Sequence, residues 1–306
     1  MFNIYNHVIN GLILASIYSL NAFGFTLVFG AIRIINFAQI EMAMLGAFLA
    51  IAITIILIAS GFSSVIFIVC VILFVGSCID GVFGVILDKI AIKKVRGAPS
   101  VAGLLLSLGL ALMIENIIML AVGSDIKVLP ELNFGEKVSF LGFYLTSVQS
   151  TILIITFIVL MLIDSFLNKT RLGMAVRATG ENAILARTMG IDTEKTISIT
   201  FFLAAICGAV AGICMALYYG VARFDMGLMP GLKGFSAAVV GGMGNPRGAI
   251  IGGLILGLAE QFTGGYISSS YQDVVAFLLL IIVLVVKPSG ILGGRTSSYH
   301  LFGGHP

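Results

Sequence analysis

The chain has 306 residues, of which 59% are hydrophobic and only 10% are charged, and its formal net charge is +3. Soluble domains carry about 25% charged residues, so this composition excludes a globular protein with a water-facing surface. Seven apolar segments are mostly near the ~20 residues that span a bilayer as a helix. They are 8–30, 39–59, 63–87, 101–122, 148–167, 197–219 and 272–287. Because these runs are too long and too uniformly apolar for barrel strands, the predicted fold class is an all-α polytopic membrane protein.

The first apolar segment is predicted to be a retained membrane helix. No basic residue precedes Arg33, whereas a cleavable signal peptide begins with a positively charged region.

The next segment, INFAQIEMAMLGAF, brings polar groups up to a long apolar run. One interpretation is a cytoplasmic turn, in which Asn36 caps the following helix and Glu41 lies in its first turn. The other is a broken helix whose N-terminal end faces the bundle interior, because a carboxylate within the bilayer marks a pathway or an ion pair. Both interpretations stay open here. The candidate pathway or gate residues are Asn36, Phe37, Gln39 and Glu41.

Two loops carry most of the positive charge. Their basic residues are Lys89, Lys93, Lys94 and Arg96 in one loop and Lys169, Arg171, Arg177, Arg187 and Lys195 in the other. The positive-inside rule places both loops, and the C-terminus with Lys287 and Arg295, in the cytoplasm. The N-terminus is then external, and a short descending segment at about 230–244 completes eight or nine crossings. The boundaries within 220–265 are not determined by the pattern.

Three glycine pairs are spaced one helical turn apart. Glycines at this spacing let two helices approach closely in a membrane, so packing is the preferred interpretation over ligand contact. They are Gly208 and Gly212, Gly248 and Gly252, and Gly253 and Gly257. The four cysteines lie inside apolar runs, which favours buried thiols over a disulfide or a metal site.

Several polar side chains lie within or at the edges of the apolar runs. We expect each to cap a helix end or to form an interhelical hydrogen bond. They are Asp80, Glu115, Asn116, Glu260 and Asp273.

A charged stretch, TRLGMAVRATGENAILARTMGID, interrupts the apolar sequence between two spans. Thr179 is expected as the N-cap, Glu181 complements the positive helix start, and Gly190 suits a glycine stop, which predicts a helix over about 181–189. Ile184, Leu185, Thr188 and Met189 share one face of it. One interpretation is a helix lying on anionic lipid, and the other, which we favour, is a docking helix for a cytoplasmic partner.

The chain carries no nucleotide-binding motif of its own. The glycine-rich run GGMGNPRGAIIGG has no lysine after it, and in GIDTEKT Glu194 replaces the second glycine of a phosphate loop. The chain is therefore not expected to be an enzyme, and any ATP dependence must come from a partner.

The sequence resembles the permease subunit of branched-chain amino acid ABC importers over almost its whole length. GLILASIYSLNAFGFTLVFGAIRIINFAQIE is similar to that family's first span and its Asn-Phe-Ala-His-Gly-Glu motif, although Gln39 and Ile40 replace the His and Gly. GLMPGLKGFSAAVVGGMGNPRGAIIGGLILGLAEQF and YQDVVAFLLLIIVLVVKPSGILG are its most family-specific runs.

The charged stretch resembles the family's coupling loop. The matching residues are Arg177, Ala178, Glu181, Ala186, Gly190 and Ile191. Aligned on Gly190, the wider importer pattern Glu-Ala-Ala-x3-Gly keeps Ala186, but Ile184 and Leu185 replace its first two residues. The residues expected to couple to an ATPase are therefore Arg177, Glu181, Ile184, Leu185, Ala186, Met189 and Gly190.

The resemblance implies a single permease domain over 1–306 in a bacterial or archaeal cytoplasmic membrane. Its partners would be two ATPase subunits that bind ATP and Mg, a second permease subunit of related but different sequence, and an external binding protein; no nucleic-acid partner is implied. The bundle would move branched-chain amino acids inward by alternating access. The same architecture also serves urea, short amides, aromatic acids and nucleosides, so these cargoes stay open. A channel and an ion-coupled secondary transporter are the rival classes.

Overall fold

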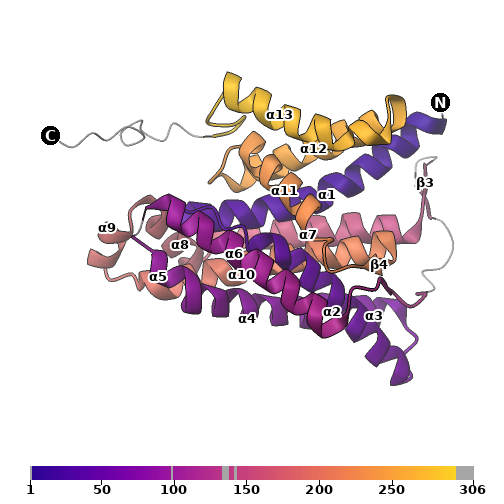
Figure 1. Ribbon diagram of the computed structural model, residues 1–306, viewed down its shortest axis with the longest axis horizontal. Coiled ribbons are helices and arrows are strands. Elements are labelled where there is room, and N and C mark those ends of the chain that lie inside the picture. Colours follow the sequence, from indigo (N-terminus) through magenta and orange to yellow (C-terminus); the bar gives the residue numbers. More distant parts are fainter. Residues whose placement is uncertain (1, 98, 133–137, 141–142, 294–306) are drawn as a thin grey trace.

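In the computed structural model, which describes residues 2–97, 99–132, 138–140 and 143–293, long helices run side by side along the molecule (Figure 1). Among these residues, seven helical segments are long and apolar enough to cross a bilayer. They are α1 (Phe2–Ile32), α2 (Gln39–Ala59), the rod Val65–Val95, α6 (Ser100–Val122), α7 (Ser147–Lys169), α10 (Thr193–Tyr219) and Ser269–Val286, which contains η3 (Ser269–Tyr271) and α13 (Gln272–Val286). The predicted all-α polytopic class is confirmed.

The rod over Val65–Val95 is not a uniform α-helix. Its parts are α3 (Val65–Val71), the π-helical η1 (Ile72–Gly76), α4 (Ser77–Leu87), the π-helical η2 (Asp88–Ile92) and α5 (Lys93–Val95). π-helical turns widen a helix locally and interrupt its regular hydrogen bonding.

Two further helices complete the bundle. α12 (Pro246–Tyr266) runs antiparallel to α1, as its contacts indicate: Gly257 packs on Ala15 and Gly253 packs on Ser19. α11 (Leu228–Gly241) has 14 residues and is about 21 Å long at ~1.5 Å per residue, too short to cross alone. The predicted descending segment at about 230–244 corresponds to α11, and α12 has 21 residues.

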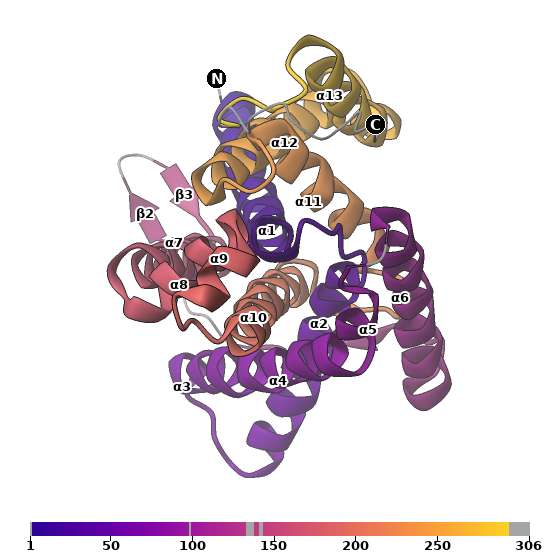
Figure 2. The ribbon, with the colours of Figure 1, turned by 90° about the vertical axis from the view of Figure 1, so that its left-hand side faces the viewer.

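The centre of the bundle is formed by α1 and α10, which the other helices surround when the molecule is viewed from one end (Figure 2). Glycines permit the close packing of α10 on α2. A Cβ at Gly208 would overlap Met42, and one at Gly212 would overlap the carbonyl oxygen of Ala43. In lipid, such backbone approach replaces hydrophobic burial as the source of helix association.

The other predicted glycine pairs lie on α12. Gly253 and Gly257 face α1, whereas Gly248 and Gly252 face α11, where added Cβ atoms would overlap backbone oxygens of Gly241 and Ala237. α12 therefore packs on α1 through one pair of glycines and on α11 through the other.

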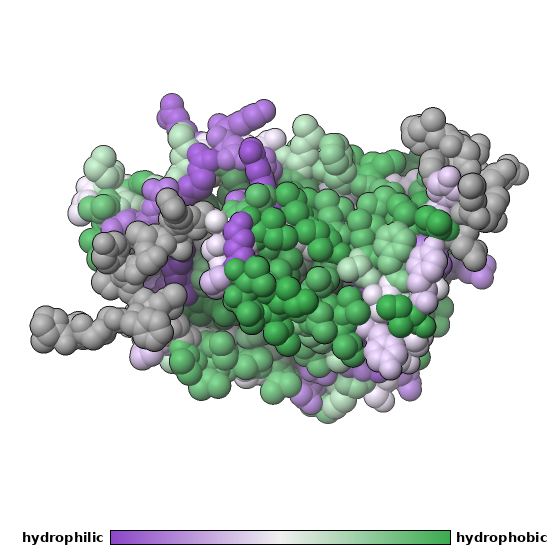
Figure 3. Space-filling view, turned by 90° about the horizontal axis from the view of Figure 1, so that it is seen from above, coloured by the Kyte–Doolittle hydropathy of each residue, from purple (hydrophilic) through white to green (hydrophobic). Residues whose placement is uncertain are grey.

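The outermost helix, α13, is almost unburied and presents a broad hydrophobic surface (Figure 3). Its exposed apolar side chains include Val274, Leu278, Ile281, Ile282 and Val285. In a soluble protein such a patch would promote aggregation, but around a membrane bundle it suits lipid or a neighbouring transmembrane subunit.

Short strands lie at one end of the molecule. β1 (Lys127–Val128) pairs antiparallel with β4 (Val221–Ala222), and β2 (Val138–Phe140) pairs with β3 (Phe143–Leu145). The charged stretch forms α8 (Arg171–Glu181) and α9 (Ala183–Thr188) at the opposite end (Figure 1).

The two basic loops meet at the end that carries α8 and α9. Lys93 Nζ contacts a Glu194 carboxylate oxygen at 2.6 Å, and Arg33 donates to the carbonyl oxygen of Gly180 at 3.4 Å. Loops predicted to share one side of the membrane are therefore adjacent. Arg295, assigned to the same side, lies outside the described residues.

Candidate functional site

The charged stretch folds as two short helices, α8 (Arg171–Glu181) and α9 (Ala183–Thr188). The predicted single helix over about 181–189, with Thr179 as its N-cap, was wrong in its start. Thr179 lies inside α8 and is buried, whereas the Asn182 side chain accepts from the backbone N–H groups of Ile184 and Leu185, at 3.0 Å each. Asparagine is as good an N-cap as threonine or better, and Asn182 rather than Thr179 is the N-cap of α9.

Two glycines near the ends of α9, Gly180 and Gly190, have different roles. Gly180 lies in α8 against the backbone of Gly30 in α1, where a Cβ would overlap the Gly30 carbonyl oxygen, so it is a packing residue and does not begin α9. Gly190 has φ +82° and ends α9 in the left-handed conformation. The Ile191 N–H then donates to the Ala186 carbonyl oxygen at 3.0 Å, which is the Schellman arrangement.

The apolar face of α9 points away from the bundle. Ile184, Leu185 and Met189 are 78%, 61% and 82% exposed, whereas Ala186 is buried against the molecule. We call Ile184, Leu185 and Met189 the α9 face. Exposed apolar side chains grouped at one end of a protein are typical of an interaction surface.

The charged residues assigned to this site lie beside the α9 face, on α8. Arg177 is exposed and its Nη1 donates to Asn168 Oδ1 at 2.5 Å, which ties α8 to the end of α7, and Glu181 is exposed at the last position of α8.

After α9 the chain enters α10 through a second side-chain cap. The Asp192 carboxylate accepts from the Lys195 backbone N–H at 3.1 Å and lies 3.1 Å from Lys195 Nζ. These hydrogen bonds with Lys195 lower the pKa of Asp192 below its ordinary value. The cap is therefore ionised at neutral pH and favours the positive N-terminus of α10.

Replacing Asn182 by alanine should loosen α9 selectively. Loss of an asparagine N-cap costs about 1 kcal/mol, which corresponds to about a fivefold rise in local opening. Hydrogen exchange of the amides in Ala183–Thr188 should accelerate by about that factor. Asn182→Asp keeps an acceptor at the cap and should exchange like the natural chain; equal acceleration in both variants would contradict the role of the cap.

At the centre of the bundle, α2 begins inside the protein. Gln39 Nε2 donates to the carbonyl oxygen of Ala204 at 2.7 Å, and Ala204 lies about 16 Å along α10 from its start at Thr193, at ~1.5 Å per residue. Asn36 is also buried, and its side chain accepts from the Ala38 N–H instead of capping α2. The predicted cap at Asn36 is therefore wrong, whereas Glu41 does lie in the first turn of α2 as expected.

The N-termini of α2 and α11 meet in this interior. Glu41, in the first turn of α2, is buried, and its Oε2 has no hydrogen-bond partner among the described residues. Gly227, immediately before α11, lies against Ile40 and Glu41. Helix N-termini carry partial positive charge, which favours a carboxylate at this junction.

Phe37 joins the same junction to the central helices. Its ring lies 6.4 Å from that of Phe25 in α1 and 5.4 Å from that of Phe235 in α11. Its backbone N–H donates to Ser107 Oγ in α6 at 3.1 Å. The four candidate pathway residues thus lie together where α1, α2, α6, α10 and α11 converge.

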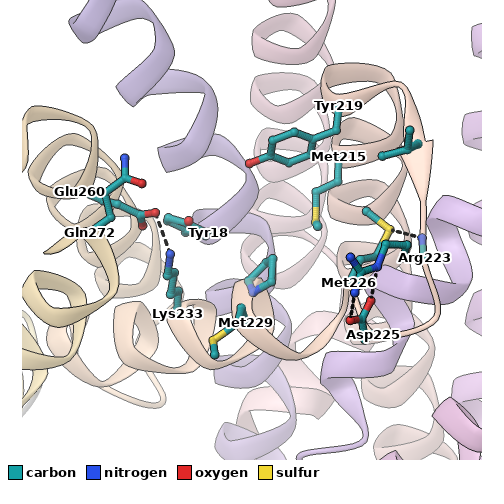
Figure 4. Close-up of a pocket in the computed structure, with 12 residues that line it drawn as sticks. Tyr18, Met215, Tyr219, Arg223, Asp225, Met226, Met229, Lys233, Glu260 and Gln272 are labelled. Carbon is teal, nitrogen blue, oxygen red and sulfur yellow. Dashed lines mark hydrogen bonds and ion pairs between the residues drawn. The ribbon is translucent and has the colours of Figure 1, made fainter. Parts of the chain in front are cut away.

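A separate pocket of about 470 Å³ lies between α1, α10, α11 and α12, with β4 at its edge. At one end of it, Lys233 Nζ lies 2.7 Å from Glu260 Oε1 (Figure 4). The same Nζ lies 2.6 Å from an Asp273 carboxylate oxygen. Lys233 and Glu260 are buried, and the ring of Tyr18 lies 5.9 Å from Lys233 Nζ.

A second ion pair, between Arg223 and Asp225, lines the opposite end of the pocket (Figure 4). Met215, Met229 and Tyr219 lie between the two charged ends.

Lys233 was not among the residues predicted from the sequence. Glu260 was expected to cap a helix end or to form an interhelical hydrogen bond, and it accepts such a bond from Lys233 of α11. Asp273, for which the same was expected, forms an ion pair with Lys233 between α11 and α13. The available signal was a lysine inside the apolar run GLKGFSAAVV, since a buried cation in a membrane protein requires a partner.

The sequence of the chain matches a known protein family and several known proteins. Residues 7–284 match the family described as branched-chain amino acid transport system / permease component. The high-affinity branched-chain amino acid transport system permease protein LivH of Escherichia coli (strain K12) is 37% identical over 289 residues, which cover 93% of this chain and 94% of LivH. The corresponding permease BraD of Pseudomonas aeruginosa is 35% identical, covering 96% of this chain and 97% of BraD. No solved structure matches the chain. The chain therefore belongs to the permease-component family of branched-chain amino acid transport systems.

Proposed function

We propose that this chain is the membrane permease of an ATP-driven importer and carries branched-chain amino acids into the cytoplasm. The observation that carries the proposal is the family match over residues 7–284, together with relatives matched along nearly their whole length. The proposed unit is one permease domain in the cytoplasmic membrane, with the α8–α9 end inside and the N-terminus outside.

The α9 face is the proposed docking site for a cytoplasmic ATPase subunit, which would bind the ATP and Mg. The physical support is its exposed apolar side chains, presented between an Asn182 cap and a Gly190 stop. Two ATPase subunits, a second permease chain of related sequence and an external binding protein complete the proposed importer.

α8 connects the α9 face mechanically to the central helices of the bundle. α9 packs on α8 and α10, and α8 packs on α1, α7 and α10. Gly180 holds α8 directly on the backbone of α1, so a displacement of α9 would be transmitted to the two central helices. Because packed helices respond as nearly rigid bodies, closure of an ATPase dimer would move α1 and α10 and alternate access to the interior.

The decisive experiment is a Leu185→Glu substitution in the α9 face. A carboxylate buried against an apolar partner surface costs several kcal/mol, so the variant should insert normally yet lose the ATPase subunit on purification in mild detergent. ATP-driven leucine uptake in vesicles should fall by at least about tenfold, which corresponds to ~1.4 kcal/mol of lost docking energy.

The matched control is Leu185→Met, which preserves apolar volume and should keep both the partner and the uptake. Full ATP-dependent uptake by Leu185→Glu would overturn the docking assignment. Leucine transport by this chain alone in liposomes, without ATP, would overturn the importer proposal in favour of a channel or a secondary transporter.

A further inference from the structure

We propose that Lys169 and Arg171, which we call the basic corner, bind the headgroup of an anionic phospholipid where α7 meets α8. The acyl chains of the same lipid lie along the apolar face of α7. This inference goes beyond the proposed function, because it concerns the lipid partner of the chain and does not depend on the cargo.

α7 lies at the periphery of the bundle (Figure 2) and presents an apolar face outward. Ile154, Ile158 and Leu162 are 58%, 48% and 63% exposed and follow one another at intervals of four residues. Side chains at this spacing share one face of a helix, whereas Ile155 and Ile163 of the same helix are buried in the bundle. An exposed apolar face on a helix of 23 residues suits the hydrocarbon core of a bilayer.

The apolar face of α7 ends at the basic corner. Lys169 follows Leu162 by seven residues, or two helical turns, so it continues the same face about 10 Å further along at ~1.5 Å per residue. Thr170 alone separates Lys169 from Arg171, the first residue of α8, so the two Cα atoms are within about 7 Å. Both side chains are exposed. Long basic side chains at the end of a membrane helix reach the headgroup region.

Neither cation of the basic corner is neutralised by the protein. The side chains of Lys169 and Arg171 form no hydrogen bond or ion pair within the part of the chain that the structure describes. Asp164, the acid that precedes them on α7, accepts a hydrogen bond from Asn168 Nδ2 at 3.0 Å, and Glu181 is at the far end of α8. The neighbouring basic residues do have polar partners: Arg177 with Asn168, Arg187 with Thr193, and Lys195 with Asp192. The charge of the corner is therefore available to an external anion.

A lipid fits the basic corner better than a soluble anion does. Leu172 and Met174, in the first turn of α8, are each about half exposed beside the two cations. A phospholipid satisfies both kinds of surface, because its phosphate pairs with the basic residues and its acyl chains cover the apolar ones. A soluble phosphate leaves the apolar side chains in water.

Lipid contact and partner docking then belong to different helices. α8 has 11 residues and is about 16 Å long at ~1.5 Å per residue, which separates the basic corner from the start of α9. The headgroup holds the first turn of α8 at the membrane surface, and the α9 face stays free for the ATPase subunit.

The test uses a fluorescent reporter on the apolar face of α7. The chain contains no tryptophan, so Leu162→Trp introduces a single one at the depth of the acyl chains of a lipid held at the corner. The full chain is reconstituted into phosphatidylcholine vesicles that contain the same minor fraction of brominated phosphatidylglycerol or of brominated phosphatidylcholine. Bromine quenches tryptophan only at short range, so quenching reports which lipid lies against α7.

Brominated phosphatidylglycerol should quench the Leu162→Trp chain more strongly. Its binding constant relative to phosphatidylcholine should be at least about fivefold, which corresponds to the ~1 kcal/mol that one basic residue contributes near an anionic surface. The double change Lys169→Gln and Arg171→Gln should abolish this preference while quenching by brominated phosphatidylcholine persists. Lys169→Arg, which keeps the charge, should retain the preference.

The matched control is the double change Lys89→Gln and Lys94→Gln in the same Leu162→Trp chain. It also removes two exposed lysines, but from η2 and α5 of the rod, and should leave the preference in place. Equal quenching by the two brominated lipids, or a preference that survives in Lys169→Gln with Arg171→Gln, would overturn the site. Absence of quenching by either lipid would show that protein covers α7 and would overturn it as well.

Discussion

Replacing Gly212 by alanine should sharply reduce the amount of folded protein that can be purified from membranes. The added Cβ would overlap the carbonyl oxygen of Ala43 in α2, and a backbone atom cannot move aside as a flexible side chain can. α10 and α2 must then separate along a contact that also includes Gly208 and Gly46. Overpacking of this kind costs about 1–3 kcal/mol or more, a large share of the ~5–15 kcal/mol that stabilises a typical protein.

The matched control for this prediction is Gly109→Ala in α6. No atom lies within 4 Å of a Cβ built at Gly109, and alanine favours a helix over glycine by about 1 kcal/mol. This variant should therefore be at least as stable as the natural chain, as measured by the thermal unfolding midpoint in detergent. Similar behaviour of the two variants would contradict the packing role of Gly212.

Replacing Lys233 by methionine should destabilise the bundle more than loss of any exposed ion pair. The change leaves Glu260 buried without a cation and facing Asp273. Breaking a buried ion pair by removing one partner costs about 3–5 kcal/mol, because the remaining charge is uncompensated. The thermal unfolding midpoint of the purified chain should fall accordingly.

Two comparisons isolate the electrostatic cause. Lys93→Met removes a pair whose side chains are both about half exposed, and such pairs contribute at most about 1 kcal/mol. The double variant Lys233→Met with Glu260→Gln should be more stable than Lys233→Met alone, because it removes the stranded carboxylate. If the double variant were less stable than Lys233→Met, the uncompensated charge of Glu260 would not be the cause of the destabilisation.

Local features of the chain were largely predictable from its sequence. The apolar runs were long enough to give the spans, and the stop of α9 at Gly190 followed from the conformational freedom of glycine. The start of α9 was misplaced because Thr179 and Asn182 are both acceptable caps, and burial of Thr179 against the bundle decided between them. Family resemblance, rather than composition, indicated an importer.

By itself, the sequence determined the membrane class, the helical spans and the positions of the basic loops, because length, hydropathy and charge act over a few turns of chain. Only the tertiary structure decided which side chains meet. It buried the Asn36–Glu41 segment, turned Ile184, Leu185 and Met189 outward, and joined Lys233 to Glu260 and Asp273. The physical reason is that pairing depends on how helices far apart in the chain are rotated and staggered against one another, and glycine contacts such as Gly212 on Ala43 set that arrangement.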